Sequence, residues 1–559
     1  MISDKMTLFR TLAEIMDSLE ATSSRNKKIE IIGNFLRTLD LDEIYSSSLF
    51  VAGRIFSESD SRRLNVSWKS MMVALGRIVQ FSRKDFDNIY SGDIGSAVEA
   101  LLQSDDFTKQ VPLFSENLTI IAVESAFEKI SQISGSGSKK QREDILVQLF
   151  QDATPREAKY LVALLTGDMR TGVSDGILAE GVASAFQLDP KIIRKAWSFT
   201  GDLGEVAKLA KLGGEERLSK VGIDYFRPVK PMLASPAEDL ESILSIGDNF
   251  AFETKLDGAR IQIHKQKNRV EIYSRRLEKI TESLPEIIEI MKSDVDTESV
   301  ILDGEALAVD NDGKPFPFQV IMRRFGRVRE AEARPIAIKL IIFDILKLGT
   351  KDIVDQRYTK RREMLQKVLA KEYLIDSMVL DNLSEVQDFF EKTKRQGHEG
   401  IVAKKVSSKY TPGVRGKNWF KFKHTLETLD LVIVSAEWGY GRRRDWLSDY
   451  HLAVRDQDGK LWEIGKTFKG LTDVEFEEMT KKLLSIETGR KRGIVFVKPE
   501  VVVEVLADEI QESPKYESGM ALRFARIKAM RDDKGIDDVT SFEALRKMYN
   551  DQFKHKARY

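Results

Sequence analysis

The sequence predicts a multidomain protein with an all-α part, an α+β part and an all-β part, in that order along the chain. Apolar residues recur at the spacing of amphipathic helices as far as about residue 225. Three prolines within nine residues, from Pro228 to Pro236, end the helical pattern and mark a boundary. Beyond Leu429, five short strands within about 100 residues suit a small closed barrel such as an OB-fold. The length of 559 residues fits three or four domains of ~150 residues each.

The composition limits the kinds of site that the chain can carry. Lys+Arg and Asp+Glu both number 88, so a nucleic-acid surface must come from local segregation of basic residues rather than from net charge. The absence of Cys excludes disulfides, cysteine nucleophiles and cysteine zinc sites, and five His residues argue against a His-rich metal site. Without a signal peptide or an apolar run near the ~18 residues of a membrane span, we expect a soluble, intracellular protein with no membrane partner.

The helical first part contains two loops in which small residues adjoin basic ones. These loops are residues 134–142 and 167–176, with the candidate binding residues Lys139, Lys140, Arg170, Thr171 and Gly172. Small residues beside basic ones, just before a helix, suit the close approach of backbone amides to phosphates. For the first loop, a flexible linker between helices is an equally good interpretation.

A lysine lies two residues before an Asp-Gly turn in the α+β part, where Lys255 precedes Asp257-Gly258. Residues 252–255 read as the end of a strand, and residues 260–264 alternate as a half-buried strand does. A lysine amine attacks only when deprotonated, so a nucleophilic Lys255 needs desolvation or nearby cations, for which Arg260 is a candidate. The alternative is an ordinary hairpin with a surface lysine, because K-x-D-G alone is a weak motif.

Further candidate residues lie at or near the ends of predicted strands in the same part. In chain order they are Arg275 after a strand at 270–274, Glu305 in a strand pair at 300–309, Phe343 in a buried strand at 338–346, Glu399 before a strand at 401–405, Lys404 within that strand, Arg415, and Lys421 and Lys423 on the last strand. Two carboxylates, several cations and one aromatic ring suggest a pocket for a nucleoside triphosphate. No Walker A motif accompanies them, so the pocket is not that of a P-loop enzyme.

Each of these residue types has a chemical use and a plainer alternative. Glu305 and Glu399 suit Mg²⁺, which prefers carboxylate oxygen, whereas isolated acids more often lie on the surface. The three lysines suit neutralisation of a phosphate, whereas alternating lysines also suit the solvated face of an edge strand. Phe343 suits stacking on a base, whereas a phenylalanine in such an apolar strand more often belongs to the core.

Taken together, these motifs resemble those of an ATP-dependent DNA ligase of the archaeal and eukaryotic replicative type, within the covalent nucleotidyltransferase superfamily. The resemblance covers essentially the whole chain, and several motifs in the right order are far more specific than any one of them. Motif I is similar to residues 253–260, motif Ia to 273–275, motif III to 303–305, motif IIIa to 343–344, motif IV to 399–404, motif V to 419–423 and motif VI to 523–534. Ala525 stands where proline is common in motif VI, which removes a turn-stiffening residue but no charge.

The resemblance implies a helical DNA-binding domain at 1–225, an adenylation (nucleotidyltransferase) domain at 226–426, and an OB-fold domain with a C-terminal helix at 427–559. It implies an enzyme that seals nicks in duplex DNA during replication, repair and recombination, with ATP and Mg²⁺ or Mn²⁺ as cofactors. Lys255 would attack the α-phosphorus of ATP, AMP would pass to the 5′-phosphate of the nick, and the 3′-hydroxyl would displace AMP. All three steps are in-line displacements, so positioning and charge neutralisation would carry the catalysis.

The resemblance also implies a role for each motif residue. Glu253 would read the adenine amino group, and Phe343 would stack on the ring. The remaining contacts would be Arg260 and Glu305 to ribose or metal, Glu399 to a second metal, Arg275, Arg415 and Lys421 to the AMP phosphate or ribose, and Arg526, Arg531 and Lys534 to the leaving pyrophosphate once the barrel domain closes. The two loops of the helical domain would grip the minor groove and backbone beside the nick, with little sequence information.

Partners and competing interpretations follow from the same residues. The expected substrate is nicked duplex DNA, and the expected protein is a monomer in the archaeal cytoplasm, at the nucleoid. The segment Gln110–Phe114 resembles a sliding-clamp peptide, although an ordinary loop is an equally good interpretation. An RNA ligase or an mRNA capping enzyme shares the core, but the helical part with Met169–Gly172 argues against both. An NAD-dependent ligase would carry a cysteine zinc site, and the absence of Cys argues against that class. The intact set of Lys255, Glu305 and Lys421 argues against a non-catalytic DNA-binding or scaffold protein.

Overall fold

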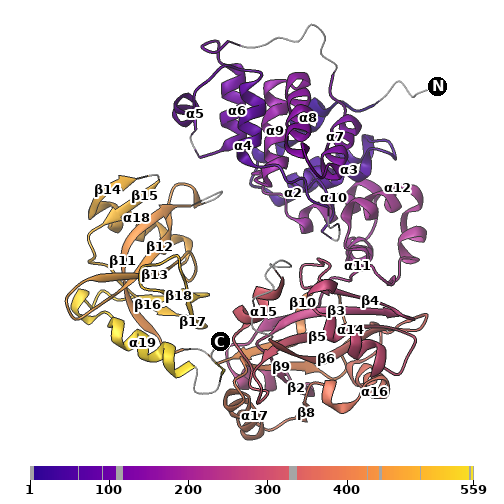
Figure 1. Cartoon of the computed structure of the whole chain (residues 1–559), viewed down its shortest axis with the longest axis vertical. Helices are drawn as coiled ribbons and strands as arrows, with labels where there is room; N and C mark the ends of the chain where they lie inside the picture. Colours follow the sequence, from indigo (N-terminus) through magenta and orange to yellow (C-terminus); the bar gives the residue numbers. More distant parts are fainter. Residues whose placement is uncertain are drawn as a thin grey trace.

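The computed structural model contains one mainly helical body, one body built on two sheets and one body mainly of strands (Figure 1). It describes residues 6–58, 60, 62–90, 92–108, 117–325, 336–424, 426–439, 443–491, 493–552 and 556–557. The helical, mixed and β parts follow one another in the predicted order, so the predicted fold class is confirmed. In these ranges, no helix combines the length and the hydropathy that a membrane crossing requires.

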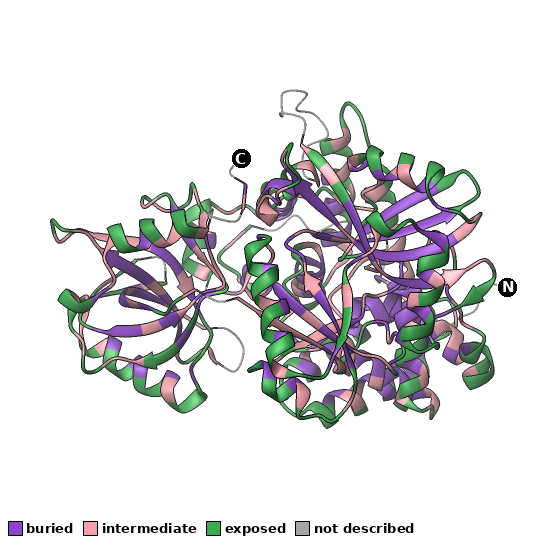
Figure 2. Ribbon diagram, turned by 90° about the horizontal axis from the view of Figure 1, so that it is seen from below, coloured by how far each residue is buried: buried purple, intermediate pink, exposed green. Residues whose placement is uncertain are grey.

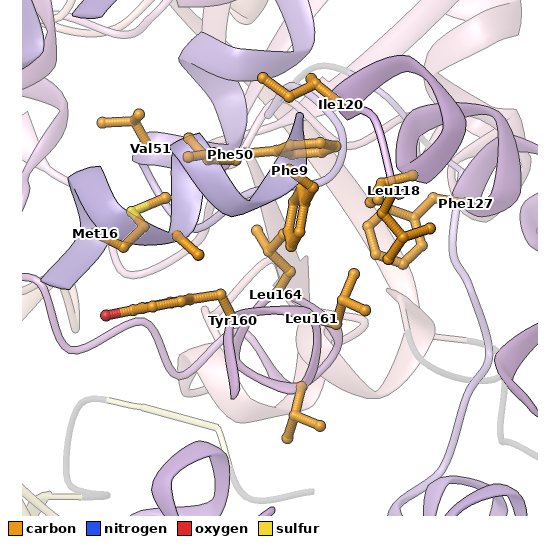
Figure 3. Packing of buried hydrophobic residues seen from close by; sticks show 14 of the residues in the cluster. Phe9, Met16, Phe50, Val51, Leu118, Ile120, Phe127, Tyr160, Leu161 and Leu164 are labelled. Carbon is orange, nitrogen blue, oxygen red and sulfur yellow. The ribbon is translucent and has the colours of Figure 1, made fainter. Parts of the chain in front are cut away.

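The first body consists of helices around an apolar core. Its helices are α1 (Phe9–Glu20), α2 (Arg25–Thr38), α3 (Ile44–Val51), α4 (Trp68–Gly76), α5 (Arg83–Ile89), α6 (Ile94–Gln103), α7 (Ile120–Gln132), α8 (Ser138–Asp152), α9 (Pro155–Thr166), α10 (Asp175–Phe186), α11 (Pro190–Thr200) and α12 (Leu203–Ser219). Side-chain caps begin several of them, as where Ser24 and Ser174 accept hydrogen bonds from first-turn amides. In the core, the Phe50 ring meets Phe9 and Phe127 edge-on, with centroids 6.5 and 6.0 Å away (Figure 3).

The middle body is built on two sheets, with strand orders β1-β10-β9-β2-β8 and β4-β3-β5-β6-β7. The strands are β1 (Leu233–Pro236), β2 (Phe250–Lys255), β3 (Ala259–Gln266), β4 (Arg269–Ser274), β5 (Ser299–Val309), β6 (Ala337–Leu348), β7 (Lys351–Asp352), β8 (Ser377–Leu380), β9 (Gly400–Lys405) and β10 (Arg415–Lys423). The helices are α13 (Leu240–Leu244), α14 (Pro285–Ser293), α15 (Phe318–Phe325), α16 (Tyr358–Val368) and α17 (Leu383–Arg395). Figure 2 shows strands largely buried beneath helices whose outer faces are exposed.

β5 is a single strand where the sequence predicts a strand pair. It runs from Ser299 to Val309 and is paired with β3 on one side and β6 on the other. Its register against β6 shifts at Asp303-Gly304. An Asp-Gly pair therefore marks an irregularity of pairing here and not a turn, because neighbouring strands hold β5 on both sides.

The third body is a β domain with more strands than the five that the sequence predicts. Its elements are β11 (Leu429–Trp438), β12 (Leu447–Arg455), β13 (Leu461–Thr467), α18 (Asp473–Ser485), β14 (Glu487–Lys491), β15 (Ile494–Val497), β16 (Val502–Leu506), β17 (Glu509–Glu512), β18 (Met520–Arg523), β19 (Arg526–Met530) and α19 (Phe542–Asp551). β11 is central, since it pairs with β12, β15 and β16. β14, for example, is short and polar, so its sequence carries no strand periodicity.

Candidate active site

Strand alternation sorts the side chains of β2, β9 and β10 onto two faces of the first sheet. One face is apolar, with Phe252 and Ile401 in a cluster that α13 and α17 cover. The other face carries the charged side chains Glu253, Lys255, Lys404, Lys421 and Lys423. This charged face is directed at the second sheet, because the Lys404 amine donates to the carbonyl oxygen of Phe343 in β6 at 3.3 Å. The site therefore lies between the two sheets.

Lys255 ends β2, with its amine 2.5 Å from Oε2 of Glu399. Lys423 lies 3.0 Å from the same oxygen. Burial opposes ionisation of Glu399, but the ammonium groups of Lys255 and Lys423 outweigh it and lower the pKa of the carboxyl. Arg260, which the sequence offers as the cation that crowds Lys255, instead pairs with Asp303 at 2.7 Å. The direct partner of Lys255 is thus a carboxylate, because Arg260 belongs to the facing sheet.

Glu253 is the centre of the most buried part of the site. It is 2% exposed; its Oε1 accepts from the Tyr358 hydroxyl at 2.6 Å and its Oε2 lies 2.7 Å from the Lys404 ammonium. The Lys404 nitrogen also lies 4.6 Å from the centroid of the Phe343 ring. Because the Lys404 ammonium is buried against Glu253, the phosphate role expected of it stays a prediction. Sequence reasoning missed Tyr358, which lies 105 residues from Glu253 and has no local signal.

Arg260 is oriented by a second buried network. Its Nε and Nη2 atoms donate to the two Asp303 oxygens at 3.0 and 2.7 Å, and its Nη1 donates to the carbonyl oxygen of Met232 at 2.7 Å. Tyr410 donates to the same carboxylate at 2.6 Å. Burial alone would lower the pKa of Arg260, but the Asp303 carboxylate outweighs burial and raises that pKa above its ordinary value. The guanidinium carbon of Arg260 lies 5.3 Å from the centroid of the Phe343 ring, which is the expected base site. Asp303 and Tyr410 therefore orient Arg260 toward this site. The sequence had assigned neither residue a role.

Arg275, Arg415 and Lys421 form a more exposed group of cations. Burial lowers the pKa of Lys421, and Lys423, Lys255, Arg415 and Arg275 lower it further. Burial also lowers the pKa of Arg275. Within the described ranges, none of the three forms an ion pair with an acid. The group therefore carries surplus positive charge, which suits a phosphate.

Asp257, Glu305 and Glu399 bring acidic groups close to Lys255. Burial raises the pKa of Glu305 to about 8, with Lys255 opposing the shift and Glu399 adding to it. Burial also raises the pKa of Asp257, again with a contribution from Glu399. Carboxyl groups that repel one another fit a divalent cation, which would stabilise their ionised forms. Among the described residues, no cluster of three or more His, Cys, Asp or Glu side chains forms a candidate metal site, so the fit rests on this repulsion.

Arg526, Arg531 and Lys534 lie in the β domain. Arg531 and Lys534 pair with Asp430 of β11 at 3.3 and 2.6 Å. Arg526 lies 4.0 Å from Asp508. The ion pairs recorded for the described residues give these three cations no partner in the middle body. Arg531 and Lys534 are thus held by Asp430 within the β domain, and the contact of the three cations with pyrophosphate stays a prediction.

The end of the chain returns to the site, which the sequence did not indicate. Lys556 lies 2.6 Å from Asp257, in the turn that follows Lys255, and the Ala557 amide donates to the carbonyl oxygen of Pro315 at 3.0 Å. A cavity of about 360 Å³ lies between the middle body and the β domain here. Its lining includes Asp257, Glu399, Lys423, Asp508 and Lys556.

The candidate DNA-binding residues of the helical body lie in different settings. Lys139 and Lys140 belong to the first turn of α8 and not to a loop, because α8 begins at Ser138 after Gly137, whose φ is 79°. Both precede the rest of α8, so their backbone amides lie at a helix N-terminus. The sliding-clamp-like segment Gln110–Phe114 lies outside the described residues.

The loop before α10 is pinned at several points. Arg170 pairs with Asp93 at 2.9 Å and with Asp168 at 3.0 Å. Thr171 is 2% exposed, and its carbonyl oxygen accepts from the Lys28 ammonium. Gly172 has a φ of 64°, which favours glycine. The Thr171 side chain is buried, so the DNA contact expected at this residue stays a prediction that involves its backbone.

Known proteins share this arrangement. Family models match residues 8–183 (DNA ligase N terminus), 231–423 (ATP dependent DNA ligase domain) and 443–534 (ATP dependent DNA ligase C terminal region). The chain is 40% identical to a DNA ligase 1 of Korarchaeum cryptofilum and 37% identical to a DNA ligase of Thermococcus onnurineus, over 98% of this chain and 99% of each relative. The solved structure Pmar-Lig_PreS3 has the same fold, with a TM-score of 0.57 at 19% identity over 93% of this chain and 99% of that one.

Two sheets that enclose a lysine, paired acids and surplus cations, flanked by a helical body and a β domain, define a nucleotidyltransferase that acts on nucleic acid ends. The chain belongs to the ATP-dependent DNA ligase family. It is an enzyme that uses ATP to seal nicks in DNA. Residues 8–183 match the family model of a DNA ligase N terminus. This match argues against an RNA ligase or a capping enzyme.

Proposed function

We propose that Lys255 is the residue that carries AMP during nick sealing. The observation that supports it is the place of its amine, at the end of β2 and 2.5 Å from Glu399, beside the cations of β10. In the first step the Lys255 nitrogen forms a bond to the α-phosphorus of ATP as the bond to the leaving pyrophosphate oxygen breaks. AMP then moves to the 5′-phosphate of the nick, and the 3′-hydroxyl displaces it. Positioning and charge neutralisation drive all three displacements.

Glu253 and Phe343 form the proposed adenine site. Each carboxylate oxygen of Glu253 has two acceptor positions, and the contacts with Tyr358 and Lys404 use one on each oxygen. The remaining positions suit the adenine amino group. Phe343 offers the ring face for stacking, and Arg260, aimed by Asp303, is close enough to reach the attached ribose.

The cations of the site divide into those for AMP and those for pyrophosphate. Arg275, Arg415 and Lys421 suit the AMP phosphate because they form no ion pair with an acid in the described ranges. Lys423 holds Glu399, and with it the direction of the Lys255 amine. Upon movement of the β domain, the motif VI cations Arg526, Arg531 and Lys534 would orient the leaving pyrophosphate.

Glu305 and Glu399 are the proposed holders of Mg²⁺, or of Mn²⁺ in its place. The bound cation would neutralise part of the triphosphate charge. Glu305→Gln replaces a charged carboxylate ligand with a neutral amide oxygen and is expected to raise the Mg²⁺ concentration for half-maximal self-adenylation by about tenfold. Titration of Mg²⁺ against the self-adenylation rate measures this, and an unchanged midpoint would contradict the assignment of Glu305.

We also propose domain limits of 1–225, 226–426 and 427–559, and a monomer that acts on chromosomal DNA in the archaeal cytoplasm. Lys139, Lys140 and Arg170 would contact DNA phosphates, while Thr171 and Gly172 hold the backbone of the second loop. Such contacts depend on salt and carry little sequence information, which suits an enzyme that works at any nick.

Incubation of the purified chain with α-labelled ATP and Mg²⁺, followed by a denaturing gel and peptide mapping, tests the proposed function. We expect label on Lys255 that is released when nicked duplex DNA is added. Label at another residue would overturn the assignment of the nucleophile. A complete lack of label would favour a non-catalytic DNA-binding protein.

A further inference from the structure

The proline-rich segment between the helical and middle bodies makes ordered contacts with both. We define residues 226–233 as the interdomain strap. Pro228 and Pro231 restrict its backbone and keep it out of a helix. The strap ends where Leu233 pairs with Arg415 of β10, next to the proposed phosphate site. It is therefore a structured connection and not a flexible linker.

Alternate side chains of β3 hold the strap by its backbone. Gln262 accepts from the Val229 amide at 2.7 Å and donates to the Val229 carbonyl oxygen at 3.0 Å. His264 Nδ1 accepts from the first amide of the strap at 2.9 Å, and burial lowers the pKa of this imidazole to about 3, which keeps it a neutral acceptor. Arg260 donates to the Met232 carbonyl oxygen at 2.7 Å. Side chains two residues apart share a strand face, so the strap lies along the face that carries Arg260.

The cationic side chains of the strap point the other way and bind the helical body. The Lys230 ammonium lies 2.6 Å from Glu58 and 3.7 Å from the centroid of the Trp197 ring, and its side chain is 13% exposed. Arg227 pairs with Glu205 of α12. The strap thus joins the helical body through charge and the middle body through backbone hydrogen bonds.

The Lys230 contact continues into the loop that precedes α10. Arg54 lies 2.8 Å from Glu58 and 2.9 Å from Asp175, the first residue of α10. Burial opposes ionisation of Glu58, but Lys230 and Arg54 lower its pKa, so the chain of alternating charges is complete at neutral pH. The loop that ends at Asp175 carries Arg170, a proposed DNA contact.

We propose that Lys230 is a positioning residue for the DNA-dependent steps, whose ion pair with Glu58 sets the helical body, and with it the nicked duplex, over the Lys255 site. This inference rests on the proposed role of Lys255. Self-adenylation involves no DNA, so loss of the ion pair leaves its rate unchanged. Transfer of AMP to the 5′-phosphate requires the duplex to be placed to within about 1 Å, and misplacement by that much costs on the order of 10- to 100-fold.

The test compares Lys230→Met with Lys195→Met in the full chain. Lys195 also joins the helical body to the middle body, 3.6 Å from Asp355, but both side chains are about 60% exposed and lie outside the strap. Single-turnover rates are measured for self-adenylation, and for AMP transfer from adenylated enzyme to saturating nicked duplex. We expect AMP transfer to slow by about 10- to 100-fold in Lys230→Met alone. Self-adenylation in both variants, and AMP transfer in Lys195→Met, should stay within about twofold of the unaltered chain.

Two further variants separate positioning from a loss of folding. Glu58→Gln breaks the same ion pair from the other side and should show the same step-specific defect, while Lys230→Arg keeps the charge and should restore AMP transfer to within about threefold. Unchanged AMP transfer in Lys230→Met, or equal slowing of both steps, would overturn the proposal. Failure of the proposed function is distinguishable, because the unaltered chain would then carry no label on Lys255 before any variant is compared.

Discussion

The buried and the exposed ends of the site differ in how their charges are balanced. At the buried end, Glu253 is paired with Lys404 and Asp303 with Arg260, and Glu253, Lys404 and Asp303 are each at most 2% exposed. At the exposed end, Arg275, Arg415 and Lys421 form no ion pair with an acid among the described residues, and Arg415 and Arg275 help to lower the pKa of Lys421. At the buried end the charges are balanced before any ligand binds, whereas at the exposed end a bound anion would balance them.

This difference separates scaffold from function. A buried charge that loses its partner is costly, so the paired end holds its side chains in one geometry at the base site. Cations that repel one another destabilise the free protein, but they stabilise charge that develops on a bound phosphate. We therefore expect substitutions at the paired end to affect folding, and substitutions at the unpaired end to affect rate.

The largest expected effect is on folding, from Lys404→Met. The variant leaves Glu253 buried beside Tyr358 without a cation, so we expect the middle body to lose about 3–5 kcal/mol of unfolding free energy. For a region of this size, that loss lowers the melting transition by on the order of 10 °C, which calorimetry measures. Adding Glu253→Gln to Lys404→Met removes the stranded charge and should recover much of the loss. An unchanged transition in Lys404→Met would falsify the proposed division.

Lys421→Met should produce the largest loss of rate at the unpaired end. We expect self-adenylation to slow by about 100-fold, because one phosphate-directed cation is lost, with no loss of thermal stability. Labelled ATP under single-turnover conditions measures the rate. Lys417→Met, on the exposed part of the same strand, is the matched control and should retain the normal rate. Similar slowing in both variants would show that strand charge in general, and not the position of Lys421, matters.

The pH dependence of stability sharpens the same comparison. Burial and the neighbouring cations lower the pKa of Lys421 below its ordinary value of 10.5. Between the lowered pKa and 10.5, the unfolded chain holds a proton that the folded chain has released, so stability from this group rises with pH in that window. Lys421→Met should therefore be more stable than the unaltered chain at pH ~7, with the difference vanishing near pH ~10.5. A pH-independent difference in melting temperature would contradict the electrostatic cause.

Lys556→Ala should have the smallest effect. The substitution removes the ion pair that joins the end of the chain to Asp257, at the boundary between the two ends of the site. Burial raises the pKa of Asp257, so its carboxyl can take up a proton once Lys556 is lost, and the effect is small. With the end of the chain released from Asp257, we expect self-adenylation to become about two- to threefold faster. Rapid-quench measurement with labelled ATP detects this. A slower reaction would instead show that Lys556 supports the catalytic geometry.

The sequence did not predict the two tyrosines that orient side chains of the site. The three-part fold class and the strands that carry Glu305, Phe343 and Lys421 follow from local periodicity. The predicted hairpin at Asp257-Gly258 is wrong, because β2 and β3 belong to different sheets and the Asp-Gly pair links them. Tyr358 and Tyr410 do not follow from local periodicity, since they meet Glu253 and Arg260 across 105 and 150 residues. Alternation within a strand shows that two residues share a face, but not which distant residue that face meets.

The sequence by itself determined the order of the motifs, the fold class and the lysine around which the site is built, because each is written in residues close together in the chain. Only the tertiary structure decided that Lys404 pairs with Glu253, that Asp303 aims Arg260, and that the strap binds both bodies. These assignments depend on which charges become neighbours when the sheets close and water is excluded. Burial makes an unpaired charge costly, so the folded chain, and not the local sequence, selects each partner.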